Sequence, residues 1–204
     1  MTLAETTKYT AVRDQIRSGD MFFFRPESWY SPTGHIGMAV WRKSDQCTLC
    51  ISESREGVGG RTVSLSSQIR KYPGRIDVLT PTDDCPRVLR ERAATVAFNW
   101  AGHSYAYWRI VAMARRRLVW LQKTFGTAPN IHDMSLSKFE EAKVCSEMFT
   151  WAYRWAKREL VRAAQLIKDC FWDALPGIGD KWAEPIPLAV GNPSFKVLAK
   201  GLVL

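Results

Sequence analysis

The chain contains no long apolar run. Its 204 residues include no stretch of about 18 consecutive apolar residues, the length that a transmembrane helix requires, so we expect no transmembrane segment. The first residues, Met1 to Lys8, also lack the basic and apolar segments of a secretory signal. We therefore expect a soluble product that is made in the cytosol without a signal peptide. Its final site of action stays open, because lysis, a phage particle or a secretion system are all routes of delivery.

Cysteine is scarce. The five cysteines are too few and too irregularly spaced for a disulfide framework in a chain of this length. Only Cys47 and Cys50 lie close together, and no second pair completes a metal-binding set. On a strand these two side chains would face opposite sides of the sheet. The pattern predicts reduced thiols, no metal and no cofactor.

Acidic residues are outnumbered by basic ones. Twenty Asp and Glu stand against 29 Lys and Arg, which gives a formal net charge of +9. A field of this sign attracts an anionic polymer or surface, such as a cell wall, a membrane or a nucleic acid. No nucleic-acid-binding motif is present, so we expect no specific nucleic-acid partner. Much of the excess lies in two helical stretches, 108–123 and 153–168, which solvent-facing helix surfaces would equally explain.

Aromatic residues are abundant by contrast. The nine tryptophans exceed what the core of one domain of this size needs. We therefore expect a few of them to line a groove or an interface, and Trp29, in a loop-like segment, is one candidate for substrate contact.

Strand patterns occupy the first part of the chain. Short apolar or alternating runs bounded by turn residues predict strands over 21–25, 35–41, 47–54, 61–65 and 75–79. Side-chain alternation then sorts the residues by face. The even-numbered residues from Ile36 to Val40 point into the core, which places His35 on the other face. In the following strand, Glu53 closes an otherwise apolar face that includes Ile51.

Helix patterns dominate the second part. Helical spacing begins near residue 84 or 85, with Pro86 at the first helical position, and continues to Gly102. Further helices are predicted over 108–124 and from residue 139 or 143 to about 170. The proline-rich tail from about residue 176 is expected to wrap over the body as extended chain. We expect a single domain that covers residues 1–204.

Cys145 stands where a strongly helical apolar pattern begins. The exposed N–H groups and the positive end of the helix dipole at such a position stabilise a thiolate over a thiol, and the thiolate is the nucleophile. The alternative interpretation is a cysteine that only fills space, because cysteine is among the most buried residue types.

A thiol nucleophile needs a base within hydrogen-bond reach and a polar group that orients this base. Among the three histidines, His103 and His132 lie in turn or loop sequences that suit surface or capping roles. His35 opens a predicted strand between Gly34 and Gly37, whose small size would keep the space over the imidazole clear. His35 is therefore the candidate base, with an ordinary strand histidine as the alternative.

Two segments together carry a family resemblance. Residues 18–24, SGDMFFF, and 34–40, GHIGMAV, resemble the opening motif of the circularly permuted branch of the NlpC-type, papain-like hydrolases, and residues 144–148, VCSEM, resemble its nucleophile motif. This branch includes the YiiX-like bacterial hydrolases and the lecithin retinol acyltransferase group. In it the histidine strand precedes the cysteine helix, as His35 precedes Cys145 here. The matches extend from about Gly19 to Phe195.

The resemblance implies a permuted papain-like α+β fold. In this fold an antiparallel sheet or small barrel packs against a helix bundle, which carries the nucleophilic cysteine at a helix N-terminus. It implies Cys145 as the nucleophile, His35 as general base and acid, and Glu53 as the acidic residue that orients His35.

The resemblance extends to other residues around the site. Residues 102–107 resemble the tyrosine-containing segment of YiiX-like members, although Ala106 replaces the usual Asp. Tyr105 is thereby a candidate oxyanion donor or substrate contact, and Ser146 and Gly34 join it as candidates beside the nucleophile and the base. Residues 185–195 resemble the closing stretch of those members.

The resemblance implies a cysteine hydrolase that attacks an amide, ester or thioester carbonyl and forms an acyl-enzyme. At a helix start, the Cys145 N–H is a candidate donor in the oxyanion hole. A cell-wall (peptidoglycan) peptidase or amidase suits a basic protein that faces an anionic polymer. A lipid acyltransferase or (thio)esterase is the alternative within the fold, with the Trp- and Arg-rich helix 108–123 as a surface anchor. A non-catalytic basic protein that binds nucleic acid or another anionic polymer is the alternative from a different class.

Overall fold

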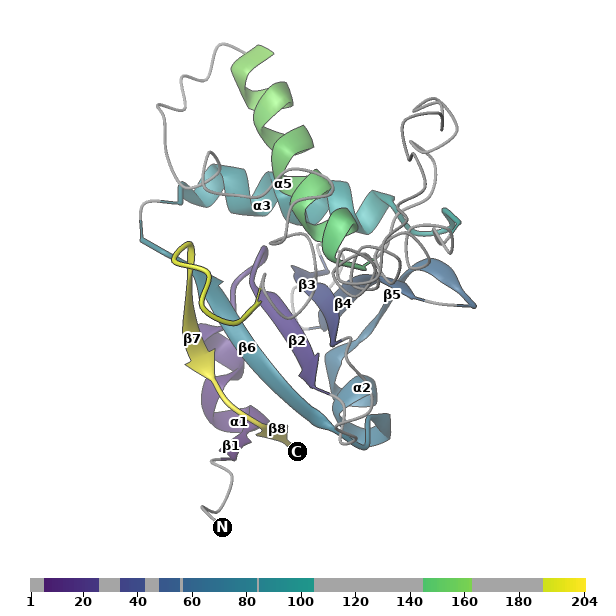
Figure 1. Ribbon diagram of the computed structural model, residues 1–204, viewed down its shortest axis with the longest axis vertical. Helices are drawn as coiled ribbons and strands as arrows, with labels where there is room; N and C mark the ends of the chain where they lie inside the picture. Colours follow the sequence, from purple (N-terminus) through teal and green to yellow (C-terminus); the bar gives the residue numbers. More distant parts are fainter. Residues whose placement is uncertain are drawn as a thin grey trace, which may run out of the picture.

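A six-stranded antiparallel sheet lies at the centre of the molecule (Figure 1). The computed structural model describes residues 6–25, 34–42, 48–55, 57–83, 85–104, 145–162 and 189–204. The strands of the sheet, in spatial order, are β5 (Gly59–Ser64), β4 (Leu49–Arg55), β3 (His35–Trp41), β2 (Met21–Arg25), β6 (Arg75–Pro81) and β7 (Phe195–Ala199).

Helices cover both faces of this sheet. The two longer ones, α3 (Arg87–Asn99) and α5 (Cys145–Arg162), cross each other on one face (Figure 1). The other face carries α1 (Tyr9–Val12), the 3-10 turn η1 (Arg13–Gln15) and α2 (Leu65–Lys71). A short parallel pair, β1 (Thr7–Lys8) with β8 (Leu202–Val203), joins the two ends of the chain. The predicted α+β class is confirmed, and the sheet is open in the order described.

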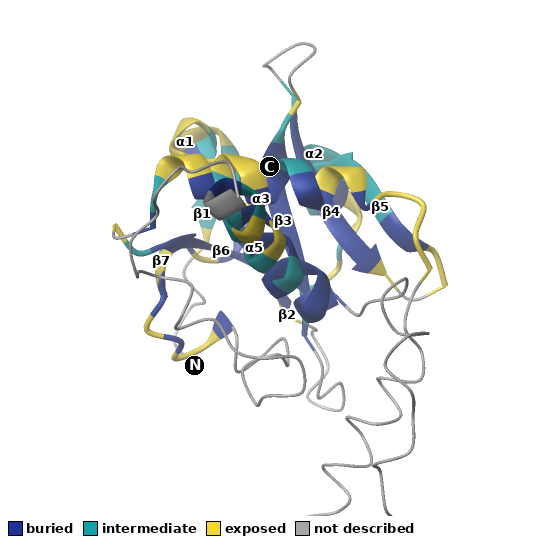
Figure 2. Ribbon diagram, turned by 90° about the horizontal axis from the view of Figure 1, so that it is seen from above, coloured by how far each residue is buried: buried dark blue, intermediate teal, exposed yellow. Residues whose placement is uncertain are grey.

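The sheet is buried on both sides, and β3 and β4 are dark blue along most of their length in Figure 2. Ile36, Met38 and Val40 belong to the core cluster that includes α3 and α5, as the alternation predicts. Ala39 and Ile51 belong to a second cluster under α1 and α2. The sheet face that carries His35 therefore packs against a second hydrophobic core and is not an open surface. On this face, the polar residues His35 and Glu53 lie toward one end of β3 and β4.

One face of α5 anchors this helix to the sheet. Met148, Phe149, Ala152, Tyr153 and Ala156 recur at helical spacing and are fully buried. Each large apolar side chain contributes roughly 1.5–3 kcal/mol by its burial. The Tyr153 hydroxyl also donates a hydrogen bond of 2.8 Å to the carbonyl oxygen of Gly19, in the turn before β2. This packing fixes where the first turn of α5, with Cys145, meets the sheet.

Two strand predictions, 21–25 and 35–41, match β2 and β3 to the residue, but other elements differ. The predicted strand 61–65 ends at Ser64, whose hydroxyl accepts a hydrogen bond from the Ser67 N–H and starts α2, a helix that the prediction missed. Pro86 is the N-cap of α3 and not its first helical residue. The proline ring fixes φ alone, and a ψ of 137° leaves Pro86 extended.

Several predictions fall outside the described residues. These include the helix over 108–124, the part of the third helix beyond Arg162, and the tail from 176 to 188. The described tail, 189–204, supplies β7 as an edge strand and β8 as the partner of β1. Among the described helices, none is long and apolar enough to cross a membrane.

Candidate active site

His35 and Glu53 meet on adjacent strands. Glu53 of β4 lies opposite Gly37 of β3, and His35 lies two residues before Gly37, on the same face of the strand. The His35 Nε2 atom is 2.7 Å from Glu53 Oε2. The Glu53 side chain is fully buried, whereas 23% of the His35 side chain is exposed. The buried Glu53 carboxylate thus contacts Nε2 from the protein interior, while another part of the His35 ring is exposed to solvent.

Arg61 completes this row and was not predicted from the sequence. It lies opposite Glu53 on β5, and its Nε donates a hydrogen bond of 2.7 Å to Glu53 Oε1. The two oxygens of Glu53 are therefore divided between His35 and Arg61. Burial raises the pKa of Glu53, but the hydrogen bonds and charges of His35 and Arg61 outweigh it and leave the pKa below its usual value. Glu53 remains a carboxylate at neutral pH.

Cys145 is the first described residue of α5 and is buried, with 4% exposure. Its thiol lies within hydrogen-bonding and charge-pairing reach of the His35 ring. Because Glu53 occupies Nε2, the Nδ1 atom of His35 is the nitrogen left to exchange a proton with the sulfur. The structure thus brings together Cys145, His35 and Glu53 from three separate elements.

The charge of His35 follows from these neighbours. Burial disfavours the imidazolium, but Cys145 first and Glu53 second stabilise it and raise the pKa of His35 to about 9. The ring is therefore protonated at neutral pH and deprotonates as the pH rises through about 9. An imidazolium beside a sulfur is the arrangement that holds a cysteine as a thiolate.

We expect the Cys145→Ala variant to lower the pKa of His35 below its native value of about 9, because the main stabiliser of the imidazolium is removed. NMR titration of the imidazole nitrogens measures this change, with the His35 signal assigned by its loss in His35→Gln. Cys85→Ala is the matched control, since Cys85 is also buried and does not contribute to the pKa of His35. An unchanged pKa in Cys145→Ala would show that the thiol does not face the ring.

Glu53→Gln is expected to reduce kcat by about 10²-fold, less than loss of the nucleophile, because the amide keeps the size but not the charge that orients and stabilises the imidazolium. Steady-state kinetics with a cleavable substrate measures the effect. The control is Glu91→Gln, which removes an exposed carboxylate from the surface ion pair with Arg87. Unchanged kinetics in Glu53→Gln would move the orienting role to another residue.

The other residues that the sequence suggested for the site are Gly34, Ser146, Trp29 and Tyr105. A Cβ on Gly34 would come within 2.2 Å of the Phe23 ring, and one on Gly37 within 2.3 Å of Ile51, so close packing requires both glycines. Ser146 is completely buried, and its hydroxyl finds no hydrogen-bond partner among the described residues. Its burial places the hydroxyl out of reach of a substrate in this conformation. Trp29 and Tyr105 lie outside the described residues.

The described part of the chain also bears on the expected absence of a metal site. No group of three or more His, Cys, Asp and Glu side chains is placed there to hold a metal ion. Cys50 is buried, and Cys47, which forms the close pair with it in the sequence, lies outside the described residues.

No protein-family model and no curated protein matches this chain. The likeness of its motifs to permuted papain-like hydrolases therefore stays a prediction.

Proposed function

We propose that this protein is a cysteine hydrolase that works through Cys145, His35 and Glu53 and an acyl-enzyme intermediate. The observation that supports it best is the division of the His35 ring between two partners. Glu53 holds Nε2 at 2.7 Å, and the neighbouring Cys145 is the group that raises the pKa of His35 most. This division is the one that a nucleophile, a base and an orienting carboxylate require.

The groups present suit a two-step transfer. The Cys145 thiolate attacks the substrate carbonyl carbon, and the carbonyl electron pair moves to oxygen, where the N–H of Cys145 is a suitable donor. His35 then gives its Nδ1 proton to the leaving amine as the carbon–nitrogen bond breaks, which leaves a thioester on Cys145. Neutral His35 takes a proton from water, the hydroxide attacks the thioester, and the carboxylic acid is released with the thiolate restored.

We propose peptidoglycan as the substrate, cleaved at a peptide or amide bond. The net charge of +9 is compatible with this choice, because it attracts the protein to an anionic cell wall, as it would to an anionic membrane. The competing lipid function depends on the predicted surface helix 108–123, which lies outside the described residues. Within the described chain, no observation favours a lipid over a peptide.

The test compares two substrate classes on the same protein. Native protein and Cys145→Ala are incubated with soluble peptidoglycan fragments and with phosphatidylcholine vesicles, and products and protein are analysed by mass spectrometry. We expect cleaved peptide from the fragments, and an acyl adduct on Cys145 after rapid acid quenching. Release of fatty acid from the vesicles, while the peptidoglycan fragments stay uncleaved, would show that the substrate is a lipid and not peptidoglycan. Equal cleavage by Cys145→Ala would overturn the mechanism.

A further inference from the structure

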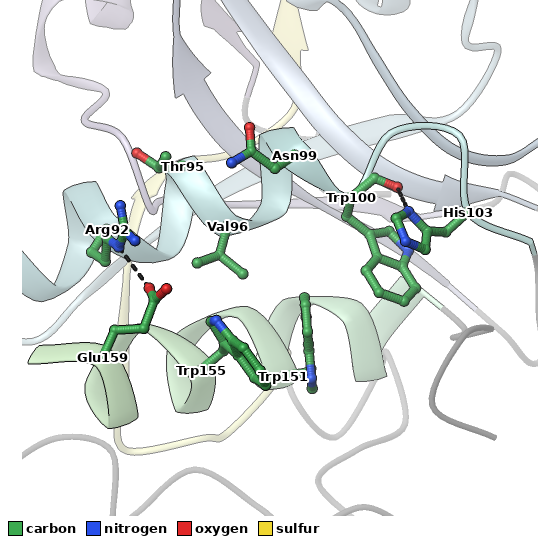
Figure 3. A pocket seen from close by; sticks show the side chains of 9 residues that line it. All are labelled: Arg92, Thr95, Val96, Asn99, Trp100, His103, Trp151, Trp155 and Glu159. Carbon is green, nitrogen blue, oxygen red and sulfur yellow. Dashed lines mark hydrogen bonds and ion pairs between the residues drawn. The ribbon is translucent and has the colours of Figure 1, made fainter. Parts of the chain in front are cut away.

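A groove lined by aromatic side chains lies between α3 and α5 (Figure 3). It encloses about 310 Å³. This volume is at the lower end of the range of small-molecule pockets, roughly 300–1,000 Å³, so the groove suits one or two rings and not a bulky ligand. Its described lining residues do not include Cys145, His35 or Glu53.

Three indole rings form the apolar part of this groove. Trp100 follows α3, whereas Trp151 and Trp155 lie one turn apart on α5. The Trp151 ring centroid is 4.8 Å from that of Trp100 and 5.6 Å from that of Trp155. Trp155 is 40% exposed. It therefore offers part of its ring to solvent and to a ligand, although the rest is packed.

The wall behind Trp100 is rigid. His103 stacks on Trp100 with ring centroids 4.0 Å apart, and the loop that carries His103 is hydrogen-bonded to Gly60 of β5 in both directions. A Cβ on Gly59 would come within 2.2 Å of the His103 carbonyl oxygen, so β5 and this loop are in tight contact. The aromatic groove is thus built on a fixed frame and is not a surface of loose side chains.

The polar groups among the described lining residues are electrically neutral as a set. Arg92 of α3 and Glu159 of α5 close one end through an ion pair of 2.6 Å between Nε and Oε2, opposite the Trp100–His103 stack in Figure 3. Asn99 adds an exposed amide, which both donates and accepts hydrogen bonds. Because these two charges cancel, the described lining residues offer no net charge to an anion or to a cation. Val96 is the single aliphatic side chain among them, which is a poor lining for an acyl chain.

We propose that this groove binds a pyranose ring of a neutral glycan. The C–H bonds on one face of such a ring meet the electron-rich face of an indole, for which Trp155 is placed, while the hydroxyl groups around the ring pair with donors and acceptors such as Asn99 and the Arg92–Glu159 pair. A neutral ligand that is apolar on its faces and polar at its rim matches the distribution of the described groups in the groove. An inorganic anion, a quaternary ammonium ion and an alkyl chain each match only part of it.

The identity of this glycan rests on the proposed function. If the substrate is peptidoglycan, the groove binds its sugar part while the attached peptide reaches Cys145. Trp155 lies ten residues after Cys145 on the same helix, which is about 15 Å along its axis. An extended peptide advances about 3.3 Å per residue, so an arm of about four or five residues spans this separation. The groove would then hold the sugar while the scissile bond lies at the thiol.

The test is a binding experiment that needs no catalysis. The full-length Cys145→Ala protein is titrated calorimetrically with a trimer of β-1,4-linked N-acetylglucosamine, and the same titration is repeated with Trp155→Ala and Asn99→Ala added. We expect saturable binding that weakens at least tenfold with Trp155→Ala and severalfold with Asn99→Ala. Phe98→Ala is the matched control, because Phe98 is a 43% exposed aromatic residue on α3 that does not line the groove, and it should leave the affinity unchanged.

Three results would overturn the inference: no binding of the trimer, binding that Trp155→Ala does not weaken, or binding of lysophosphatidylcholine in its place that Trp155→Ala abolishes. The outcome is separate from that of the proposed function. Cleavage of sugar-free peptides without trimer binding would overturn the glycan site alone. Trimer binding that depends on Trp155, in a protein that cleaves no peptide, would support the site and overturn only its assignment to a peptidase substrate.

Discussion

Cys145→Ala is expected to reduce turnover by roughly 10⁴-fold or more while the protein stays folded. The sulfur is the only described thiol beside His35, and without it the acyl group has no acceptor. The substitution removes a single buried atom from the end of α5. The helix keeps its anchoring side chains from Met148 to Ala156, so we expect little change in secondary structure.

Kinetics on peptidoglycan fragments measures the loss, and circular dichroism with thermal unfolding measures the fold. The Cys145→Ser variant gives a stricter test, because its hydroxyl fits the same space but does not ionise near neutral pH. We expect Cys145→Ser to be as inactive as Cys145→Ala. Cys50→Ala and Cys85→Ala, at two other buried cysteines, should retain turnover. Full activity of a folded Cys145→Ala protein would rule out the mechanism.

His35→Ala is expected to cause a loss of the same order, because the thiolate, its counter-ion and the proton donor disappear together. Residues that act as a unit are not additive, so the double variant Cys145→Ala/His35→Ala should be no slower than either single variant. Steady-state kinetics of the three proteins gives this comparison. A double variant whose loss is the product of the two single losses would show that the residues act independently.

Alkylation provides a second measurement of the same pair. In the native protein, iodoacetamide should modify Cys145 faster than the other cysteines below pH 7, since His35 lies beside this thiol as its base and counter-ion. His35→Ala should remove this advantage. Cys50 and Cys85 are internal controls whose modification should not change, and peptide mass mapping follows each site. Equal labelling of all cysteines in the native protein would contradict the ion pair.

The strand pattern of the sequence predicted the strand faces of His35 and Glu53 correctly. An alternation of period two is a local property, so it places His35 and Glu53 on defined faces before any pairing is known. Arg61 was missed for the opposite reason. Its position opposite Glu53 depends on the register of the β4–β5 hairpin, and the turn near Gly57 and Gly59, where φ is positive, sets that register.

The aromatic groove is a harder case. The excess of tryptophan correctly pointed to an aromatic-lined groove, but the sequence pattern did not indicate which rings would form it. Trp100 and Trp151 come from different helices, and their contact depends on how α3 and α5 cross, which helical periodicity alone does not specify. Local patterns thus predicted which residues share an element, and packing between distant elements determined which of them share a site.

The three-strand row of His35, Glu53 and Arg61 has a consequence for how the site is assembled. These residues lie on consecutive antiparallel strands joined by short connections, whereas Cys145 arrives on a helix far along the chain. Contacts between near neighbours in sequence form with a smaller loss of chain entropy than distant ones. The charged row should therefore exist before the thiol docks. Local detachment of α5 would remove Cys145 from the site and stop the proposed reaction. The hydrogen bonds among His35, Glu53 and Arg61 would stay formed, so re-docking of α5 would restore the site.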